Sequence, residues 1–260
     1  MTAERPLTGK VALVTGAGRG IGAAIARRLA RDGALVAVHY GHSEDAAGKV
    51  VAEIREAGGR AFAVGARLGV PGDAEAVFSA FDAGLEEELG RPGAAVLDIL
   101  VNNAGTSGSG PLEKATSDIF DRMMAVNAKA PFFLVQQALP RLREGGRIIN
   151  ISSLASRRAF PESLAYAMSK GALDTMTLGL AKELAPRGIT VNAIGPGFIE
   201  TDMNARRRTT PEARAALAAR SAFARIGAPA DVADVVAFLA SEDSRWMTGQ
   251  YVEVSGGTDL

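Results

Sequence analysis

TGAGRGIGAAIA, residues 15–26, joins a strand-like segment to a helix-like one. KVALVTG at 10–16 is typical of a buried strand, and IGAAIARRLARDG at 21–33 has the apolar spacing and closing glycine of a helix. Glycines in such a turn let the backbone approach a pyrophosphate, whose charge the helix N-terminus stabilises. Because GRGIGA at 18–23 matches G-x-G-x-x-G/A in this context, we expect a dinucleotide site here. Its expected loop contacts are Gly16, Gly18, Arg19, Gly20, Ile21 and Gly22.

Short apolar runs alternate with longer amphipathic segments along the chain. The runs expected to form strands are 10–16, 34–40, 60–66, 97–105, 146–153, 188–197 and 249–257. The segments expected to form helices are 21–33, 43–59, 73–90, about 116–144, the segment around 166–170 that ends near 186–188, and 231–243. Pro131 and Pro140 lie inside the fourth, so we expect a break or kink there. The alternation predicts one α/β domain, residues 1–260, with a parallel sheet covered by helices on both faces.

Composition narrows the classes of function. Lys+Arg and Asp+Glu both number 29, so the net charge is zero, and we expect neither nucleic acid nor a membrane as a partner. The absence of cysteine excludes thiol catalysis and disulfides, and two histidines are too few for a usual histidine metal site, so we expect no metal. The first residues lack the features of a signal peptide, and no apolar run is long enough to span a membrane. We therefore expect a cytoplasmic protein.

The residues after the second strand bear on the choice of dinucleotide. An Asp or Glu about 20 residues beyond the glycines usually binds the ribose 2′-hydroxyl of NAD. Here Tyr40, His42 and Ser43 stand in that region, and the first carboxylate is Glu44. Arg19, inside the loop, is placed to meet a 2′-phosphate. NADP(H) is favoured, and NAD(H) stays open if Arg19 is solvated and Glu44 reaches back.

The stretch YAMSK, 166–170, places Tyr166 and Lys170 one helical turn apart, thirteen residues after Ser153. A phenol with a reference pKa of about 10 is a poor base at neutral pH. A nearby ammonium and a cationic nicotinamide would lower that pKa, so that Tyr166 exchanges a proton with a substrate oxygen held by Ser153. Each residue also has an ordinary alternative: a packing tyrosine, a turn-forming serine and a solvated lysine.

Taken together, the Gly loop, NNAG at 102–105, Ser153 and Y-x-x-x-K resemble the short-chain dehydrogenase/reductase family over nearly the whole chain. The sequence is most similar to the 3-oxoacyl-[acyl-carrier-protein] reductase-like branch. The resemblance implies a single-domain, Rossmann-like, doubly wound parallel sheet of about seven strands. It also implies that Tyr166 is the acid/base, that Ser153 orients the carbonyl, and that Lys170 bonds the nicotinamide ribose. Asn127 matches the asparagine that holds a water in the proton relay.

The same resemblance implies further cofactor contacts and an oligomer. The matching positions are Asn103, Ala104, Gly105, Leu68, Pro196, Gly197, Ile199 and Thr201. One position departs from the family pattern: Arg67 precedes Leu68 where the family usually has an Asp that contacts adenine. Members of the family commonly form homotetramers, which we therefore expect as the partner arrangement.

The segments expected above the nicotinamide are 153–163 and a substrate lid at about 200–227. The second contains Arg206, Arg207, Arg208, Arg214, Arg220 and Arg225. These arginines indicate either a landing patch for a phosphopantetheine carrier or coenzyme A, or an ordinary solvated helix, which we favour.

The expected activity is NADPH-dependent reduction of a small-molecule or thioester ketone to a secondary alcohol, with a 3-oxoacyl thioester as one candidate. An NAD-dependent alcohol, polyol or steroid dehydrogenase is the alternative enzyme, and a non-catalytic dinucleotide sensor is the alternative outside enzymes. The sequence leaves the ketone, the physiological direction and the stereochemistry open.

Overall fold

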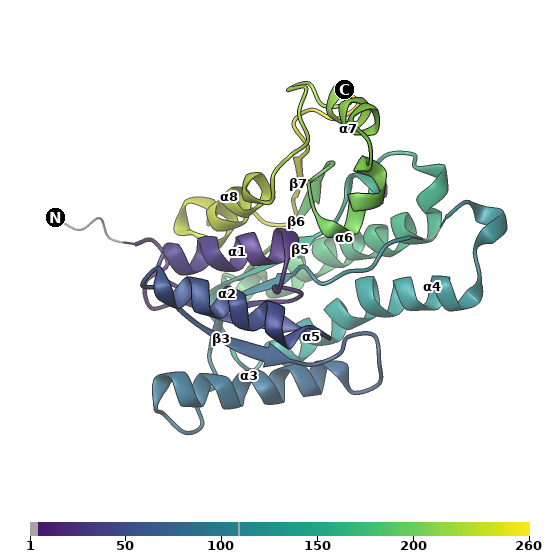
Figure 1. Cartoon of the computed structure of the whole chain (residues 1–260). Coiled ribbons are helices and arrows are strands. Elements are labelled where there is room, and N and C mark those ends of the chain that lie inside the picture. Colours follow the sequence, from purple (N-terminus) through teal and green to yellow (C-terminus); the bar gives the residue numbers. More distant parts are fainter. Residues whose placement is uncertain (1–4, 109) are drawn as a thin grey trace.

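Seven parallel strands form one sheet in the computed structural model, which describes residues 5–108 and 110–260 (Figure 1). Their order across the sheet is β3-β2-β1-β4-β5-β6-β7, and every neighbouring pair is parallel. The strands are β1 (Val11–Val14), β2 (Leu35–Tyr40), β3 (Arg60–Gly65), β4 (Leu97–Asn102), β5 (Leu142–Ile151), β6 (Thr190–Pro196) and β7 (Tyr251–Val254). The predicted doubly wound parallel sheet is confirmed.

Helices cover both faces of the sheet (Figure 1). Against one face pack α1 (Gly20–Arg31), α2 (Glu44–Glu56) and α8 (Pro229–Ala240). Against the other pack α3 (Asp73–Leu89), α5 (Ala130–Ala138) and α6 (Leu164–Leu184). The remaining α-helices are α4 (Ser117–Met124), beside α6, and α7 (Pro211–Ala219). The central strands are buried on both faces, which is why they read as continuous apolar runs.

The strand order positions the ligand crevice. The chain leaves β1 toward β2 and β3 on one side, and continues from β4 to β7 on the other. Ligands bind in open α/β sheets at the carboxyl ends of the strands where the order reverses, which here lies between β1 and β4. The Gly loop follows β1 and NNAG follows β4, so both motifs meet at this point.

The region predicted as one helix at about 116–144 differs in extent. It contains α4, a π-turn at Ala125–Lys129 and α5, and it ends at Ala138. Pro131 is the second residue of α5 and cannot donate a backbone hydrogen bond, and the expected break is the π-turn just before it. The helix stops short of Pro140, and β5 already begins at Leu142, so the predicted end of the helix was too late.

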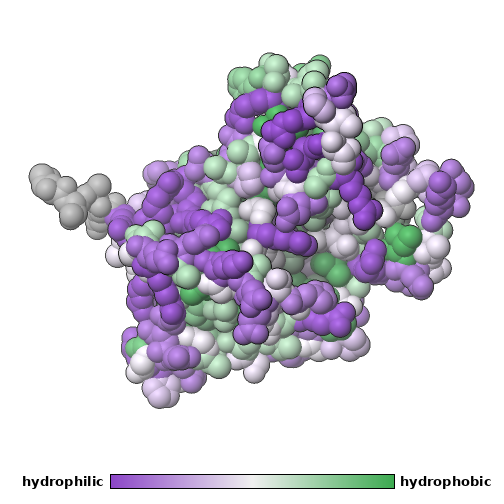
Figure 2. All heavy atoms as spheres, in the orientation of Figure 1, coloured by the Kyte–Doolittle hydropathy of each residue, from purple (hydrophilic) through white to green (hydrophobic). Residues whose placement is uncertain are grey.

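The surface is polar over much of the face in Figure 2, including the region of α1 and α2. Hydrophobic residues gather at the top, around the segment that carries α7. Met203 and Phe223 of this segment are exposed. Within 5–108 and 110–260, no helix is both long enough and apolar enough to cross a membrane.

Candidate active site

The Gly loop is packed so closely that two of its glycines have no room for a side chain. Gly16 has φ +63°, and a Cβ there would lie 2.9 Å from the Cα of Ala104. A Cβ on Gly22 would lie 2.4 Å from Asn103 Nδ2 and from the Gly16 carbonyl oxygen. The Gly loop between β1 and α1 therefore packs directly against its own backbone and the end of β4. Because glycines carry no side chain, an anion can approach the backbone amides at the start of α1. This arrangement fits a dinucleotide pyrophosphate.

The end of β4 fixes the Gly loop. Asn103 Nδ2 donates to the carbonyl oxygens of Thr15 at 2.8 Å and Gly16 at 3.1 Å. In return, the Thr15 hydroxyl accepts from the backbone amides of Asn103 at 2.9 Å and Ala104 at 3.0 Å. The predicted residues Asn103 and Ala104 thus brace the loop from the neighbouring strand.

His39 also holds the loop, a role that the sequence did not indicate. Its Nδ1 accepts from the Gly16 amide at 3.1 Å, and its Nε2 lies 3.0 Å from the Ala66 carbonyl oxygen. This pattern requires the neutral imidazole with the proton on Nε2. Burial lowers the pKa of His39 to about 4, against a smaller opposing effect of the Ala66 hydrogen bond. His39 therefore connects the turns after β1 and β3 as an uncharged bridge.

This buried imidazole predicts a pH dependence of stability. The unfolded chain takes up a proton on His39 near pH 6.5, whereas the folded chain resists it down to about pH 4. The free energy of unfolding should therefore decrease as the pH falls from about 6.5 to about 4, and His39 should account for roughly 3 kcal/mol of this decrease. Urea unfolding of the His39→Gln variant should show a correspondingly weaker pH dependence, while the exposed His42→Gln control keeps the wild-type slope. An unchanged slope in His39→Gln would contradict the assignment.

Two charged side chains, Arg19 and Glu44, lie near the expected position of the cofactor ribose. The nearest ion-pair partner of Arg19 is Asp202 at 3.9 Å, and both side chains are more than three-quarters exposed. Such a pair contributes little, so the Arg19 guanidinium is available to a ligand. Burial raises the pKa of Tyr40, as do the charge and hydrogen bond of Glu44. Glu44, which opens α2, thus interacts with the Tyr40 phenol.

The candidate catalytic residues come from two elements. Ser153 follows β5, and Tyr166 and Lys170 lie on the first turns of α6. Lys170 is buried, and its Nζ donates to the Ile151 carbonyl oxygen at 2.8 Å. The Lys170 Nζ also lies 6.0 Å from the centre of the Tyr166 ring. Burial lowers the pKa of Lys170 to about 8, and Asp174 opposes this shift.

The pKa of Tyr166 differs from the sequence-based expectation. Burial raises it, and the hydrogen bond with the Ser153 side chain only partly opposes this. Lys170 was expected to lower it, but its Nζ is engaged with a backbone carbonyl on the β5 side. The protein alone therefore keeps Tyr166 as a neutral phenol, which is the form that donates a proton.

Asn127 lies at the centre of the π-turn and is fully buried. Its Nδ2 donates to the Thr106 carbonyl oxygen at 2.9 Å and to Ser169 Oγ at 3.0 Å, and its Oδ1 accepts from the Thr106 amide at 2.8 Å. Gly105 leaves space beside it: a Cβ there would lie 3.3 Å from Asn127 Oδ1 and 3.5 Å from Lys170 Nζ. The Asn127 amide and the Lys170 ammonium thus both lie beside Gly105.

The residues predicted to close over the nicotinamide follow β6. Thr201 lies beside the Gly loop: a Cβ placed on Gly20 would be 3.3 Å from Thr201 Cγ2. Ile199 is buried and forms an isolated bridge to Gly227, which ties the two ends of the lid segment together. Pro196 is the last residue of β6. Gly197 packs against Ser255: a Cβ placed on Gly197 would be 2.8 Å from the Cα of Ser255. Leu68 is partly buried and packs against the core on the α3 face of the sheet.

Four of the six arginines of the predicted lid segment, residues 200–227, form ion pairs. Arg208 and Arg214 both bind Glu200, at 3.0 Å and 2.7 Å, and Arg225 binds Asp231 at 2.7 Å. These contacts hold the segment to its own ends. They favour a structural role for the arginines over a landing patch for an acidic carrier.

Arg220 joins the lid to two aromatic rings and to Asp259. Its guanidinium lies 4.7 Å from the centre of the Phe198 ring and 5.4 Å from that of Phe160, and its Nε donates to Asp259 Oδ1 at 2.9 Å. The two rings meet edge to face, with centres 6.3 Å apart. Phe160 precedes α6 and Phe198 follows β6, so they form an aromatic wall beside the carboxyl ends of the strands.

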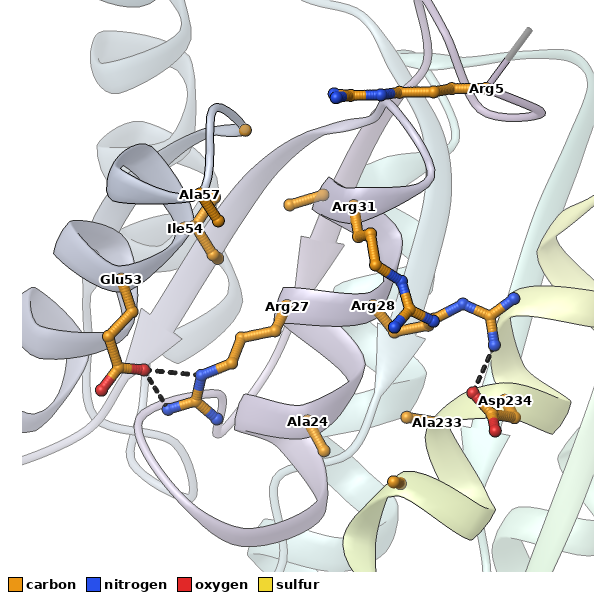
Figure 3. Close-up of a pocket in the computed structure, with 13 residues that line it drawn as sticks. Arg5, Ala24, Arg27, Arg28, Arg31, Glu53, Ile54, Ala57, Ala233 and Asp234 are labelled. Atoms are coloured by element: carbon orange, nitrogen blue, oxygen red, sulfur yellow. Dashed lines mark hydrogen bonds and ion pairs between the residues drawn. The ribbon is translucent and has the colours of Figure 1, made fainter. Parts of the chain in front are cut away.

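A cavity of about 380 Å³ lies elsewhere, between α1, α2 and α8 (Figure 3). Arg27 bonds Glu53 at 2.6 Å and Arg28 pairs with Asp234, as the dashed lines show. The helices α1 and α2 end here, so their arginines also offset the negative helix termini. None of the predicted site residues lines this cavity, which is at the opposite edge of the sheet.

Known proteins resemble this chain over nearly its whole length. Residues 16–259 match a family model described as enoyl-(acyl carrier protein) reductase. A solved angucycline C-6 ketoreductase with bound NADP is 53% identical, with a TM-score of 0.92 over 98% of this chain and 97% of that one. A short-chain dehydrogenase/reductase from Serratia marcescens is 40% identical, with a TM-score of 0.88 over 98% of this chain and 100% of that one. A hydroxynaphthalene reductase of Aspergillus fumigatus is 40% identical over 257 residues, 95% of this chain and 91% of that protein.

The match to the family model includes β2 to β7, the Gly loop from Gly16 onward and the segment that carries Ser153, Tyr166 and Lys170. We conclude that the chain belongs to the short-chain dehydrogenase/reductase family of oxidoreductases.

Proposed function

We propose that this protein reduces a ketone to a secondary alcohol with NADPH, with Tyr166 as the proton donor. The observation that carries the proposal is the convergence of Ser153, Tyr166 and Lys170 at the carboxyl edge of the sheet, beside the Gly loop. NADPH, when bound, supplies the hydride that goes to the carbonyl carbon. The phenol of Tyr166 gives its proton to the carbonyl oxygen, which balances the two-electron reduction.

The other residues have supporting roles in this proposal. Ser153 donates a hydrogen bond to the substrate oxygen and so stabilises the developing negative charge. Lys170 binds the nicotinamide ribose, and its ammonium favours the phenolate left after proton transfer. Asn127 holds the water through which Tyr166 regains a proton. We assign the lid role to residues 200–227. The bridge between Ile199 and Gly227 joins the two ends of this segment, and the ion pairs of Glu200 with Arg208 and Arg214 hold it further.

The choice of NADPH over NADH rests on Arg19. Its guanidinium is exposed at the start of α1, and no carboxylate occupies 40–43, where a ribose-binding acid would stand. A structure of a ketoreductase that is 53% identical contains NADP. NAD-dependent oxidation of an alcohol, polyol or steroid is the alternative that this choice sets aside.

Arg19→Ala should therefore discriminate between the two cofactors. A hydrogen bond to a charged group contributes about 1.5–3 kcal/mol, so kcat/KM for NADPH should fall roughly tenfold or more. The value for NADH should stay unchanged, because NADH carries no 2′-phosphate. Steady-state kinetics with each cofactor and a saturating ketone would measure this. Equal losses for both cofactors would contradict a phosphate contact at Arg19.

We further propose that the substrate carries its ketone on a fused aromatic ring system. Phe160 and Phe198 offer ring faces and edges beside the strand ends, with Arg220 stacked on both. A relative that is 40% identical is a hydroxynaphthalene reductase. The 3-oxoacyl thioester is the competing substrate, but four of the six lid arginines pair with carboxylates within the described residues, which weakens the case for a carrier patch.

A substrate panel tests the function as a whole. The purified protein would be assayed with NADPH and with NADH on a fused-ring hydroxyaryl ketone, an acetoacetyl thioester and a simple aliphatic ketone. We expect NADPH-dependent reduction that is fastest on the fused-ring ketone. Preference for the thioester would overturn the substrate class, and preference for NADH would overturn the cofactor. Cofactor binding without turnover of any ketone would support the sensor alternative.

The remaining proposals concern organisation. We propose that residues 1–260 act as one dinucleotide-binding and catalytic domain, in the cytoplasm and as a homotetramer. The exposed apolar side chains on α5 and α6, among them Phe132, Met168 and Leu178, support a contact between subunits along these helices. Size-exclusion chromatography with light scattering would measure the assembly.

A further inference from the structure

We propose that Tyr251 is a positioning residue for the reduction: it fixes the backbone carbonyl of Ser153 and so directs the Ser153 hydroxyl toward the substrate oxygen. The inference rests on the proposed function, in which Ser153 binds that oxygen. Tyr251 is the first residue of β7 and lies 98 residues from Ser153 along the chain.

The Ser153 carbonyl oxygen accepts three hydrogen bonds. Tyr251 Oη donates at 3.0 Å, Ser156 Oγ at 2.8 Å and the Ser156 amide at 3.1 Å. The two bonds from Ser156 come from the same short 3-10 turn, Leu154–Ser156, and would move with it. Of these three donors, only Tyr251 belongs to another element, so its phenol ties the Ser153 carbonyl to β7.

A glycine in β6, Gly195, leaves room for the Tyr251 phenol to reach the turn that begins at Ser153. Tyr251 pairs with Ala193 of β6, below the carboxyl end of the strand, and its ring passes over Gly195. A Cβ on Gly195 would lie 1.9 Å from Tyr251 Oη and 2.2 Å from its Cζ. Any side chain at position 195 would therefore displace the hydroxyl from the Ser153 carbonyl. The path from β7 to Ser153 depends on this glycine.

A second contact holds the ring from the side of α6. The Arg157 guanidinium carbon lies 4.6 Å from the centre of the Tyr251 ring, and Arg157 Nε donates to Asp174 Oδ2 at 3.3 Å. Asp174 is buried on α6, one turn after Lys170. The ring is thus held between β6 and an ion pair anchored on the helix that carries Tyr166 and Lys170.

The Tyr251 phenol is a permanent donor. Burial raises its pKa to about 12; the Ser156 hydrogen bond and Arg157 oppose this shift, and the charges of Asp174 and Glu253 add to it. It therefore stays protonated across the ordinary working range and does not compete with Tyr166 as an acid/base. Its hydrogen-bond partners, the Ser153 carbonyl oxygen and the Ser156 side chain, both lie in the turn that begins at Ser153, so its effect on turnover passes through this turn.

Fixing this carbonyl restrains the direction of the Ser153 side chain. The carbonyl lies in the planar peptide after Ser153, so a bond to its oxygen limits rotation about the Cα–C bond, which sets the Cα–Cβ direction relative to that plane. Within the same turn, Ser153 Oγ accepts from the Ala155 amide at 3.2 Å, which limits rotation of the hydroxyl about Cα–Cβ. An error of a fraction of an ångström in a group that stabilises a transition state lowers the rate while leaving cofactor binding intact. Tyr251 should therefore affect kcat and not the affinity for NADPH.

A double-mutant cycle with Ser153 tests this. In the wild-type background, Tyr251→Phe keeps the ring and removes only the hydroxyl, and we expect kcat to fall about threefold to tenfold. The Kd for NADPH, measured by fluorescence titration, should not change. In the Ser153→Ala background, Tyr251→Phe should cause no further fall in kcat, because the hydroxyl that it positions is gone.

Ser244→Ala is the matched control, because Ser244 is a fully buried serine whose hydroxyl donates to two backbone carbonyls away from the site. It should keep wild-type kcat although it also loses buried hydrogen bonds. A fall in kcat for Tyr251→Phe that is equally large without Ser153 Oγ would overturn the inference, as would an unchanged kcat. Failure of the proposed function itself would show separately, as absence of turnover in the wild type or full turnover by Tyr166→Phe.

Ser156→Ala provides a second variant if Tyr251→Phe does not fold. It removes the other hydroxyl that binds the Ser153 carbonyl and leaves β7 untouched. We expect a smaller fall in kcat, again absent in the Ser153→Ala background. A fall that persists in that background would count against the role of the carbonyl.

Discussion

Tyr166→Phe is expected to abolish nearly all ketone reduction while NADPH still binds. The phenol is the group that transfers a proton to the substrate oxygen in the proposed reaction, and general acid catalysis contributes about 10²–10⁴-fold to a rate. Phenylalanine keeps the ring that lies 6.0 Å from Lys170 Nζ, so the shape of the pocket is preserved. Stopped-flow measurement of hydride transfer would give the fall in rate, and fluorescence titration would give the Kd for NADPH.

The matched control for this variant is Tyr40→Phe, which removes a phenol hydroxyl at the ribose end of the crevice, far from the carbonyl. It should change the KM for NADPH and leave kcat close to the wild-type value. If Tyr166→Phe kept more than about a tenth of the wild-type rate, the assignment of Tyr166 as the acid would be wrong.

Gly22→Ala is expected to weaken dinucleotide binding severely. The new methyl group would lie 2.4 Å from Asn103 Nδ2 and from the Gly16 carbonyl oxygen, both of which belong to the brace that closes the loop. Overpacking of this kind costs about 1–3 kcal/mol, so the Kd for NADPH should rise by roughly one to two orders of magnitude. Calorimetric titration of the folded variant would measure the change.

Gly48→Ala is a useful control, because Gly48 lies on α2 near the same crevice and a Cβ there meets nothing within 4 Å. Alanine in a helix interior is favoured over glycine by up to about 1 kcal/mol, so this variant should be slightly more stable and bind NADPH normally. Equal Kd values for Gly22→Ala and wild type would show that the loop relaxes around the methyl group, against the close packing described for it.

The sheet and the Gly loop could be predicted because their signals are local. An apolar run, a glycine turn and an amphipathic segment lie together in residues 10–33, and parallel strands bring all their carboxyl ends to one edge. The placement of Ser153 and Tyr166 at that edge followed from the same rule. The roles of these residues in catalysis stay predictions until the variants are measured.

The features that the sequence did not indicate depend on contacts between distant segments. His39 contacts the turns after β1 and β3 at once, and Tyr251 reaches Ser153 across β6, so neither role has a local pattern. The pKa of Tyr166 was expected to fall, but burial raises it, and burial depends on the whole fold. Sequence spacing also cannot show that Lys170 Nζ turns toward a backbone carbonyl.

The π-turn at Ala125–Lys129 sets a limit on how far this enzyme can be stabilised by redesign. A π-turn is less regular than the α-helices that flank it, and sequence optimisation for helix stability would tend to straighten it. Straightening would rotate the Asn127 amide away from Thr106 and Ser169. Thermostabilising substitutions are therefore best sought on the outer faces of α2 and α3, with these five residues left unchanged.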